Sequence, residues 1–129
     1  PELRIIIDHL PNAQIPVGQE TAYHADLLRL AERPNVFAKL AEIPQHGPNG
    51  LIVDSAFYND RLAVLWDAFG EDRCFFGSDR PNSDHLADFA ATLGLVKRCM
   101  ADQRQAVQEK FFLHNAVRIY SPTLPPGGL

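Results

Sequence analysis

Asp8, His9, Lys39 and Asp79 each lie at or directly beyond the end of a short apolar run. In parallel α/β proteins, active sites form at the carboxyl ends of the strands, where the loops leave the sheet. If these apolar runs are strands of one parallel sheet, their ends bring carboxylate, imidazole and amine groups to one edge. The four residues are therefore the first candidates for catalysis or binding.

Asp79 is the strongest of these candidates because of the residues on either side of it. Gly77 and Ser78 allow the backbone to turn sharply out of the preceding run, and Pro81 fixes the exit. A carboxylate at such an edge can bind a metal ion, or take a proton from an attacking water and return it to the leaving group. The structural alternative is an Asx turn or a cap on the next helix.

The other candidates also have structural alternatives. His9 suits a metal ligand or a donor to a substrate carbonyl, but a loop histidine can simply bond a neighbouring carbonyl. Asp8 could orient His9, although adjacent strand side chains point to opposite faces and a direct bond does not follow. Lys39 could bind an anionic substrate group or send its charge into solvent. Arg80 could bind a substrate carboxylate or pair with Asp84.

Several other kinds of site are not expected. The remaining histidines have no mutual metal-ligand spacing, and Cys74 and Cys99 form no CxxC pair. This pattern therefore argues against a disulfide framework or a zinc knuckle, and a reducing cytoplasm is the expected compartment. No glycine-rich phosphate loop, GxSxG element or Cys–His nucleophile pattern is present, which argues against covalent acyl-enzyme chemistry.

The elements that position the candidates alternate between two kinds of pattern. We predict strands at 3–7, 36–40 and 74–76, and helices at 20–32 and 57–69, with turn-forming residues between them. Strands separated by helices form parallel sheets with right-handed crossovers and with both faces covered. The pattern therefore predicts an α/β fold with a parallel sheet.

Helix ends and loops give more local predictions. Pro34 should end the first helix, and Gly70 should form a left-handed cap after the second. The loop over 44–50 is long enough to be a functional loop. Ser83 is expected to cap a helix that Gly94 breaks. The apolar face of that helix is predicted to comprise Leu86, Phe89, Ala90 and Leu93.

Three strands are few for such a fold. A (β/α)₈ barrel takes about 250 residues and a doubly wound sheet usually has five or more strands, whereas this sequence has 129 residues. With two more helices predicted at about 103–113 and 115–120, the set corresponds to about three-eighths of a barrel. We therefore expect an incomplete piece of a barrel-type enzyme.

Composition and charge limit the partners. A hydrophobic fraction of 46% and a charged fraction of 22% are those of an ordinary folded domain. The net charge of −4 provides no basic field for nucleic acid. No run approaches the roughly 20 apolar residues that cross a bilayer. We expect a small-molecule substrate, no nucleic acid and no membrane, with a homo-oligomer left open.

Four segments, taken together and in order, resemble those of one known family. They are Ile6-Ile7-Asp8-His9-Leu10-Pro11, Asn35-Val36-Phe37-Ala38-Lys39-Leu40, Phe76-Gly77-Ser78-Asp79-Arg80-Pro81 and His114-Asn115-Ala116-Val117-Arg118-Ile119-Tyr120. The family they resemble is the amidohydrolase-related family of barrel hydrolases. The resemblance implies that residues 1–121 are the last three βα units of a TIM barrel with C-terminal helices, followed by a Pro/Gly-rich tail at 122–129.

The resemblance also implies an activity. It points to a hydrolase acting on a lactone or a related carbonyl substrate, with Asp79 as the acid/base group and His9 polarising the carbonyl. Arg80 and Lys39 are the candidate substrate-binding residues. A divalent metal such as zinc, with His9 and Asp79 as ligands, is one option and no metal is the other. Some relatives decarboxylate aromatic acids, so decarboxylation is an alternative activity.

The sequence departs from the family pattern in two places. Arg80 stands where an aromatic residue, often Trp, is common in Gly-Ser-Asp-x-Pro, which implies a more anionic substrate. The family's His-x-His element, from the end of its first strand, is absent from these 129 residues. We therefore expect the full-length parent to be the enzyme and this piece alone to be inactive, with a non-catalytic remnant as the alternative.

Overall fold

The computed structural model describes residues 3–10 and 15–120. Among these residues the strands and helices alternate along the chain, with a hairpin between the second strand and the second long helix. The elements in chain order are β1 (Ile5–Leu10), α1 (Glu20–Ala31), β2 (Val36–Leu40), β3 (Gln45–Gly47), β4 (Gly50–Ile52), α2 (Ser55–Phe69), β5 (Cys74–Phe76), a 3₁₀ turn (Asn82–His85), α3 (Phe89–Cys99), α4 (Gln105–Glu109), a π-helical turn (Lys110–His114) and α5 (Asn115–Tyr120).

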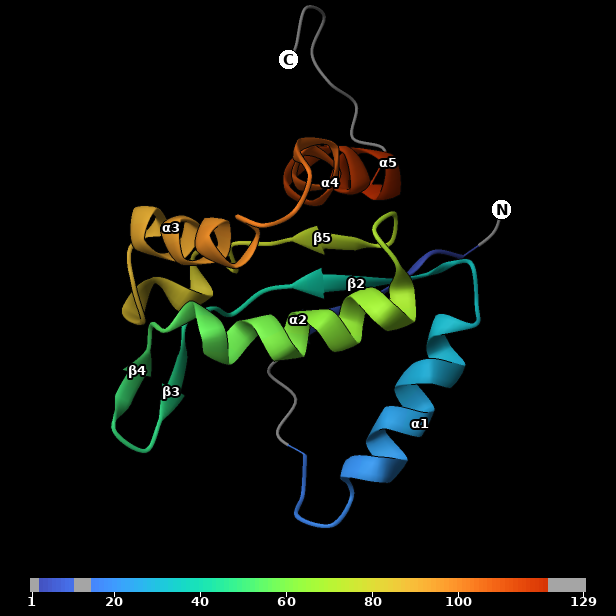
Figure 1. Cartoon of the computed structure of the whole chain (residues 1–129), viewed down its shortest axis with the longest axis horizontal. Helices are drawn as coiled ribbons and strands as arrows, with labels where there is room; N and C mark the ends of the chain where they lie inside the picture. The colour runs from blue at the N-terminus through green and yellow to red at the C-terminus, as the bar shows by residue number, and fades with distance from the viewer. Residues whose placement is uncertain (1–2, 11–14, 121–129) are drawn as a thin grey trace, which may run out of the picture.

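The main sheet is parallel, as the alternation predicts. Its three strands are ordered β1-β2-β5, with Ile6 opposite Phe37 and Ala38 opposite Cys74. Figure 1 shows α2 lying across the sheet while α4 and α5 lie beyond β5. Because parallel strands end on the same side, the carboxyl ends of all three strands meet at one edge.

The two faces of the sheet bury different side chains because strand residues alternate between them. Val36, Ala38 and Leu40 face the main core, which also contains Tyr58 and Leu62 of α2. Phe37 and Phe75 face the other way and pack against Ile119 of α5. The side chains at positions 37 and 39 share a face, so Lys39 lies on the face covered by α5 rather than in the main core.

Asn115 and Arg73 join the helices to the sheet through backbone carbonyls. The Asn115 side-chain amide is buried and donates to the carbonyls of Glu71 and Cys74, both at 2.8 Å. The Arg73 guanidinium donates to the carbonyl of Ala31 at the end of α1, at 2.8 Å, and to that of Phe69 at the end of α2, at 3.0 Å. These bonds fix the start of β5, which leads to Asp79.

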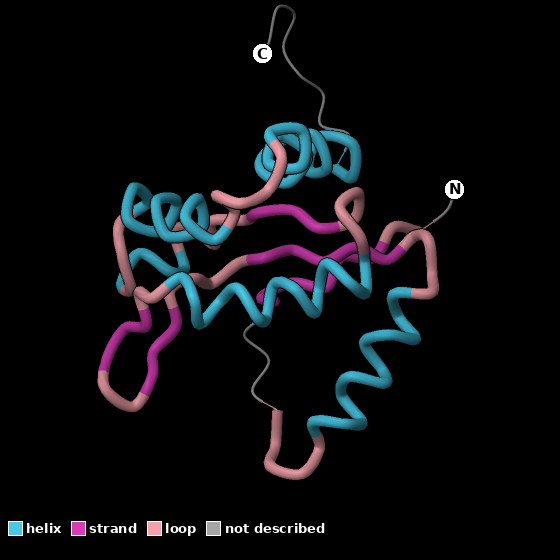
Figure 2. Tube along the Cα trace, viewed as in Figure 1, coloured by secondary structure: helices cyan, strands magenta, loops and turns pink. Residues whose placement is uncertain are grey.

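The loop predicted over 44–50 is instead part of an antiparallel hairpin. Strands β3 and β4 pair with Gln45 opposite Ile52, and the hairpin projects away from the main sheet (Figure 2). The buried Tyr58 hydroxyl closes the hairpin, because it accepts from the Gln45 N–H at 2.9 Å and donates to the Ile52 carbonyl at 2.7 Å. A hydroxyl from the following helix thus decides the structure of this segment.

The helix after β5 differs from its prediction in three respects. Asp88, and not Ser83, caps α3, since its carboxylate accepts from the Ala91 N–H at 2.7 Å. Gly94 lies inside α3 and does not break it. The predicted apolar face is also wrong, because Phe89 is 49% exposed and the buried residues are Thr92, Leu95 and Val96. The 3₁₀ turn at Asn82–His85 precedes α3, which starts only at Phe89, so Leu86 lies before the helix.

The other predicted boundaries agree more closely with the structure. Strand β2 has the predicted bounds, while β1 starts two residues later than predicted and continues through Asp8 and His9. Gly70 follows α2 with a positive φ of 72°, but its ψ of 171° lies outside the left-handed helical region, so the predicted left-handed cap is not formed. Within the described ranges, no helix has the length and apolar character needed to span a membrane. The tail at 122–129 lies outside the described residues.

Candidate active site

The carboxyl edge of the sheet contains a cavity of about 430 Å³ lined by residues from all three strand ends. Asp8 and His9 come from β1, Lys39 from β2, and Asp79 and Arg80 from the segment after β5. All five candidates from the sequence therefore line the same cavity. The sequence predicted only that these residues lie at the same edge of the sheet. The parallel pairing of the strands brings their side chains together in one cavity.

The backbone is in the left-handed region at each of the three strand ends. His9 has a φ of 57°, Glu42 of 59° and Asp79 of 54°. Non-glycine residues seldom adopt this conformation, and when they do they often belong to functional sites. At His9 the register of β1 against β2 also shifts between Ile7 and Leu10, an irregularity that redirects side chains at the end of a strand.

Asp79 is held by the two residues that open the next turn. Its carboxylate accepts from the Ser83 hydroxyl at 2.5 Å and from the Asn82 amide at 3.4 Å. Ser83 is buried, so the buried hydroxyl fixes one carboxylate oxygen. These bonds come from side chains and not from a backbone N–H, which distinguishes them from the Asx turn that was the structural alternative for Asp79. Ser83, predicted as a helix cap, has this role instead.

Asp8 and Lys39 form an ion pair in the cavity wall, with Lys39 Nζ 2.6 Å from Asp8 Oδ2. The Lys39 stem passes over Gly77, where an added Cβ would lie 3.0 Å from Lys39 Cδ. Burial by itself would raise the pKa of Asp8, but the hydrogen bonds from Lys39 and from the His9 backbone outweigh it, so this pKa lies below its usual value of 3.8. Asp8 is therefore ionised and paired at neutral pH.

His9 lies between two carboxylates. Its Nδ1 is 3.2 Å from Glu42 Oε2, and its Nε2 is 3.6 Å from Asp8 Oδ2. Glu42 was not among the sequence candidates, because it lies two residues beyond the end of β2 in a run of mostly apolar residues. A charged residue in that run, so soon after a strand end, is the signal that would have identified it.

Arg80 has a structural partner in this fold. Its guanidinium pairs with Asp84 and donates to the Ala87 carbonyl, while its Nε is buried without a hydrogen-bond partner among the described residues. The salt bridge with Asp84 that the sequence left open is thus formed. A role for Arg80 in substrate binding stays a prediction.

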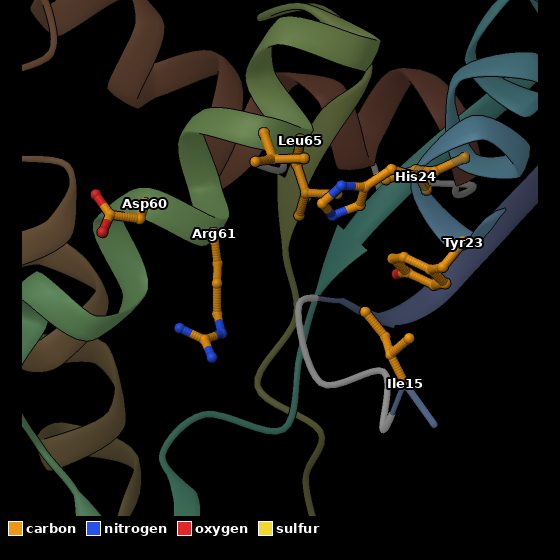
Figure 3. Close-up of a pocket in the computed structure, with 8 residues that line it drawn as sticks. Ile15, Tyr23, His24, Asp60, Arg61 and Leu65 are labelled. Carbon is orange, nitrogen blue, oxygen red and sulfur yellow. The ribbon is translucent and has the colours of Figure 1, made fainter. Parts of the chain in front are cut away.

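A second hollow, of about 300 Å³, lies between α1 and α2 (Figure 3). Its lining includes Tyr23, His24 and Arg61. The Arg61 guanidinium is already occupied, since it stacks 3.7 Å from the Phe57 ring centroid and donates to the Phe57 carbonyl. This hollow lies between helices and not at the strand ends, where parallel α/β proteins form their active sites. We therefore place the candidate site at the carboxyl edge.

Whether the cavity can bind a metal ion depends on which side chains around it could act as ligands. A catalytic zinc site uses three protein ligands and a water. Within residues 3–10 and 15–120, no three His, Cys, Asp or Glu side chains are placed to hold one ion. His9 and Asp79 both line the cavity, but the described residues by themselves do not fit a complete site.

Known proteins are similar to this chain in sequence and fold over part of their length. A profile of the amidohydrolase family matches residues 1–121. The L-fucono-1,5-lactonase of Burkholderia ambifaria is 34% identical over 103 residues, which cover 77% of this chain and 34% of the lactonase. The chain thus spans about a third of the length of this curated relative.

Solved structures give the same result. An amidohydrolase from Burkholderia multivorans with bound zinc has a TM-score of 0.77 at 26% identity, over 95% of this chain and 44% of that one. Amidohydrolase 2 from Bifidobacterium longum subsp. infantis has a TM-score of 0.67 at 28% identity, over 92% and 40% of the two chains.

These matches account for the parallel strands and for the edge they share. The α/β fold corresponds to a portion of the TIM barrel of amidohydrolases. The profile match runs through all three strand ends that line the cavity. The chain belongs to the amidohydrolase family.

Proposed function

We propose that the full-length protein is a hydrolase that opens a lactone or a related carbonyl substrate, with Asp79 as its acid/base group. In this proposal residues 1–121 are the last three βα units of the barrel. The observation that carries it is the meeting of Asp79 and His9 in one cavity at the carboxyl edge of the parallel sheet. The similarity to a lactonase supports the choice of substrate class.

Asp79 has the chemistry that lactone opening requires. Water attacks the carbonyl carbon, the bond from that carbon to the ring oxygen breaks, and a hydroxy acid is formed. The Asp79 carboxylate takes a proton from the water and returns it to the ring oxygen. The hydrogen bonds from Ser83 and Asn82 keep the carboxylate oriented toward the cavity through this transfer.

The remaining cavity residues have supporting roles in this proposal. His9 contacts the attacking water or the substrate from the neighbouring strand end. Lys39 and Arg80 are the residues proposed to bind a negatively charged substrate group, each in addition to its own ion pair. For a full-length protein that binds zinc, as the B. multivorans relative does, His9 and Asp79 are the ligands that we propose from this chain.

The test is the Asp79→Asn variant of the full-length protein, assayed with L-fucono-1,5-lactone and other sugar 1,5-lactones by following acid release. Asparagine has nearly the same shape, tolerates a left-handed backbone and can still accept from Ser83. The fold should therefore persist while turnover falls by about 10²–10⁴-fold.

A matched control separates the catalytic role from a general loss of charge. Asp26→Asn changes an exposed aspartate on α1 and should leave turnover at the wild-type level. Thermal unfolding should be similar for all three proteins. Wild-type turnover in Asp79→Asn would remove the acid/base role from this residue.

A further inference from the structure

Glu42 contacts the His9 ring without being part of the cavity. Its Oε2 lies 3.2 Å from His9 Nδ1. His9 and Asp8 both line the cavity, whereas Glu42 is not among its lining residues. A carboxylate in this place acts on the histidine and not on a molecule bound in the cavity.

Asp8, the other carboxylate beside His9, is already committed elsewhere. Its Oδ1 accepts the His9 backbone N–H at 2.8 Å, and its Oδ2 accepts from Lys39 Nζ at 2.6 Å. The distance from Asp8 Oδ2 to His9 Nε2 is 3.6 Å, which is too long for an N–H···O hydrogen bond. Among the described residues, Glu42 is thus the carboxylate within hydrogen-bond distance of the ring.

A neutral imidazole carries one N–H, and an ionised carboxylate can only accept a hydrogen bond. The contact with Glu42 therefore requires the proton on Nδ1 and leaves a lone pair on Nε2. Nε2 is the nitrogen on the side of Asp8, which lines the cavity.

We infer that Glu42 is a positioning residue that holds neutral His9 as its Nδ1-protonated tautomer and presents the Nε2 lone pair at the cavity. In the reaction proposed above, on which this part rests, His9 accepts a hydrogen bond from the attacking water or from a substrate hydroxyl. It does not donate to the carbonyl oxygen. Glu42 thereby excludes the donor role that the sequence left open for His9, while a lone pair on Nε2 stays compatible with the ligand role.

The backbone supports a functional reason for glutamate here. Glu42 has a φ of 59°, a conformation in which glycine is unstrained and a side chain carries an energetic cost. Strained backbone of this kind is often found at functional sites, and the contact with His9 gives Glu42 such a functional role. Replacing Glu42 by glycine should therefore leave the stability unchanged or higher while the His9 ring loses its partner.

The direct test is the ring ¹⁵N spectrum of His9 in the full-length protein, recorded on the neutral ring and assigned by its loss in His9→Asn. The wild type should show Nδ1 protonated and Nε2 unprotonated. Glu42→Gly should shift the population toward the Nε2-protonated tautomer. Glu42→Gln keeps an acceptor oxygen at the same reach, so it should retain more of the wild-type tautomer. Glu32→Gln, an exposed glutamate after α1, is the control and should change nothing.

Activity gives a second readout. With L-fucono-1,5-lactone, kcat/KM should fall by about 10- to 100-fold in Glu42→Gly, the size typical for residues that orient a catalytic histidine, and by less in Glu42→Gln. The melting temperature of Glu42→Gly should be equal to or above that of the wild type.

Two outcomes would overturn the inference. One is a wild-type His9 tautomer in Glu42→Gly. The other is a wild type whose proton lies on Nε2. Because the spectrum needs no substrate, it decides the role of Glu42 even if the protein does not hydrolyse lactones, and that failure would count against the proposed function alone.

Discussion

Asn115 connects α5 to the strand that leads to Asp79. Its replacement by alanine measures how much this connection contributes to the free energy of unfolding. The side chain is 2% exposed, and its amide donates to the Glu71 and Cys74 carbonyls, both at 2.8 Å. Alanine removes both donors. Water has little access to either bond, so it cannot replace them well.

The expected loss follows from these two bonds. Each neutral hydrogen bond contributes about 0.5–1.5 kcal/mol net, and alanine regains roughly 0.5 kcal/mol through its higher helix propensity. We expect Asn115→Ala to lower the free energy of unfolding by about 0.5–2.5 kcal/mol. Asn115→Asp should cost more than alanine, because it places a negative charge beside two carbonyl oxygens.

Urea unfolding of the full-length protein measures both effects, with the midpoint falling and the slope unchanged. Asn59→Ala, at an exposed asparagine on α2, is the matched control and should stay within about 0.5 kcal/mol of the wild type. A loss below about 0.5 kcal/mol for Asn115→Ala, or a smaller loss for aspartate than for alanine, would refute the reasoning.

Two further predictions concern pH. Lys110 donates a hydrogen bond to Asp72 that lowers the pKa of Asp72 below its usual value of 3.8, and the resulting stabilisation is lost as the pH falls below that value. Lys110→Gln should therefore reduce the loss of melting temperature between pH 5 and 3. An unchanged loss would contradict the pairing. Burial raises the pKa of the Cys74 thiol to about 12 from 9.0. Because this thiol ionises at a lower pH in the unfolded chain, the free energy of unfolding should fall as the pH rises above 9, by at most on the order of 4 kcal/mol. The fall should be less steep in Cys74→Ala. A Cys74→Ala melting curve that falls as steeply as the wild type would contradict this.

The elements that depend on local pattern could be read from the sequence. The strand at Val36–Leu40 and the helix that begins at Glu20 agree with their predictions, because apolar spacing and proline positions act within a few residues. The hairpin at residues 45–52 could not be read in this way. It depends on the Tyr58 hydroxyl, which reaches back from the next helix to bond Gln45 and Ile52.

The same difference separates Asp79 from its partners. Gly77 and Pro81 identified the turn that carries Asp79. Ser83 was mistaken for a helix cap, since its hydroxyl bonds a side chain four residues back instead of a backbone N–H. Glu42 was missed because its contact with His9 spans 33 residues. Neither bond follows from short-range spacing.

The sequence by itself determined that Asp8, His9, Lys39 and Asp79 lie at strand ends, and the four family-like segments placed those ends in order. It could do so because strand ends and turns are set by residues next to each other along the chain. The tertiary structure alone decided which of these groups touch. Asp8 contacts Lys39, and Glu42 contacts His9, because the three strands pair in parallel, the register shifts at His9 and the backbone is left-handed at each strand end. Such contacts depend on distances between chain segments and not on the order of those segments.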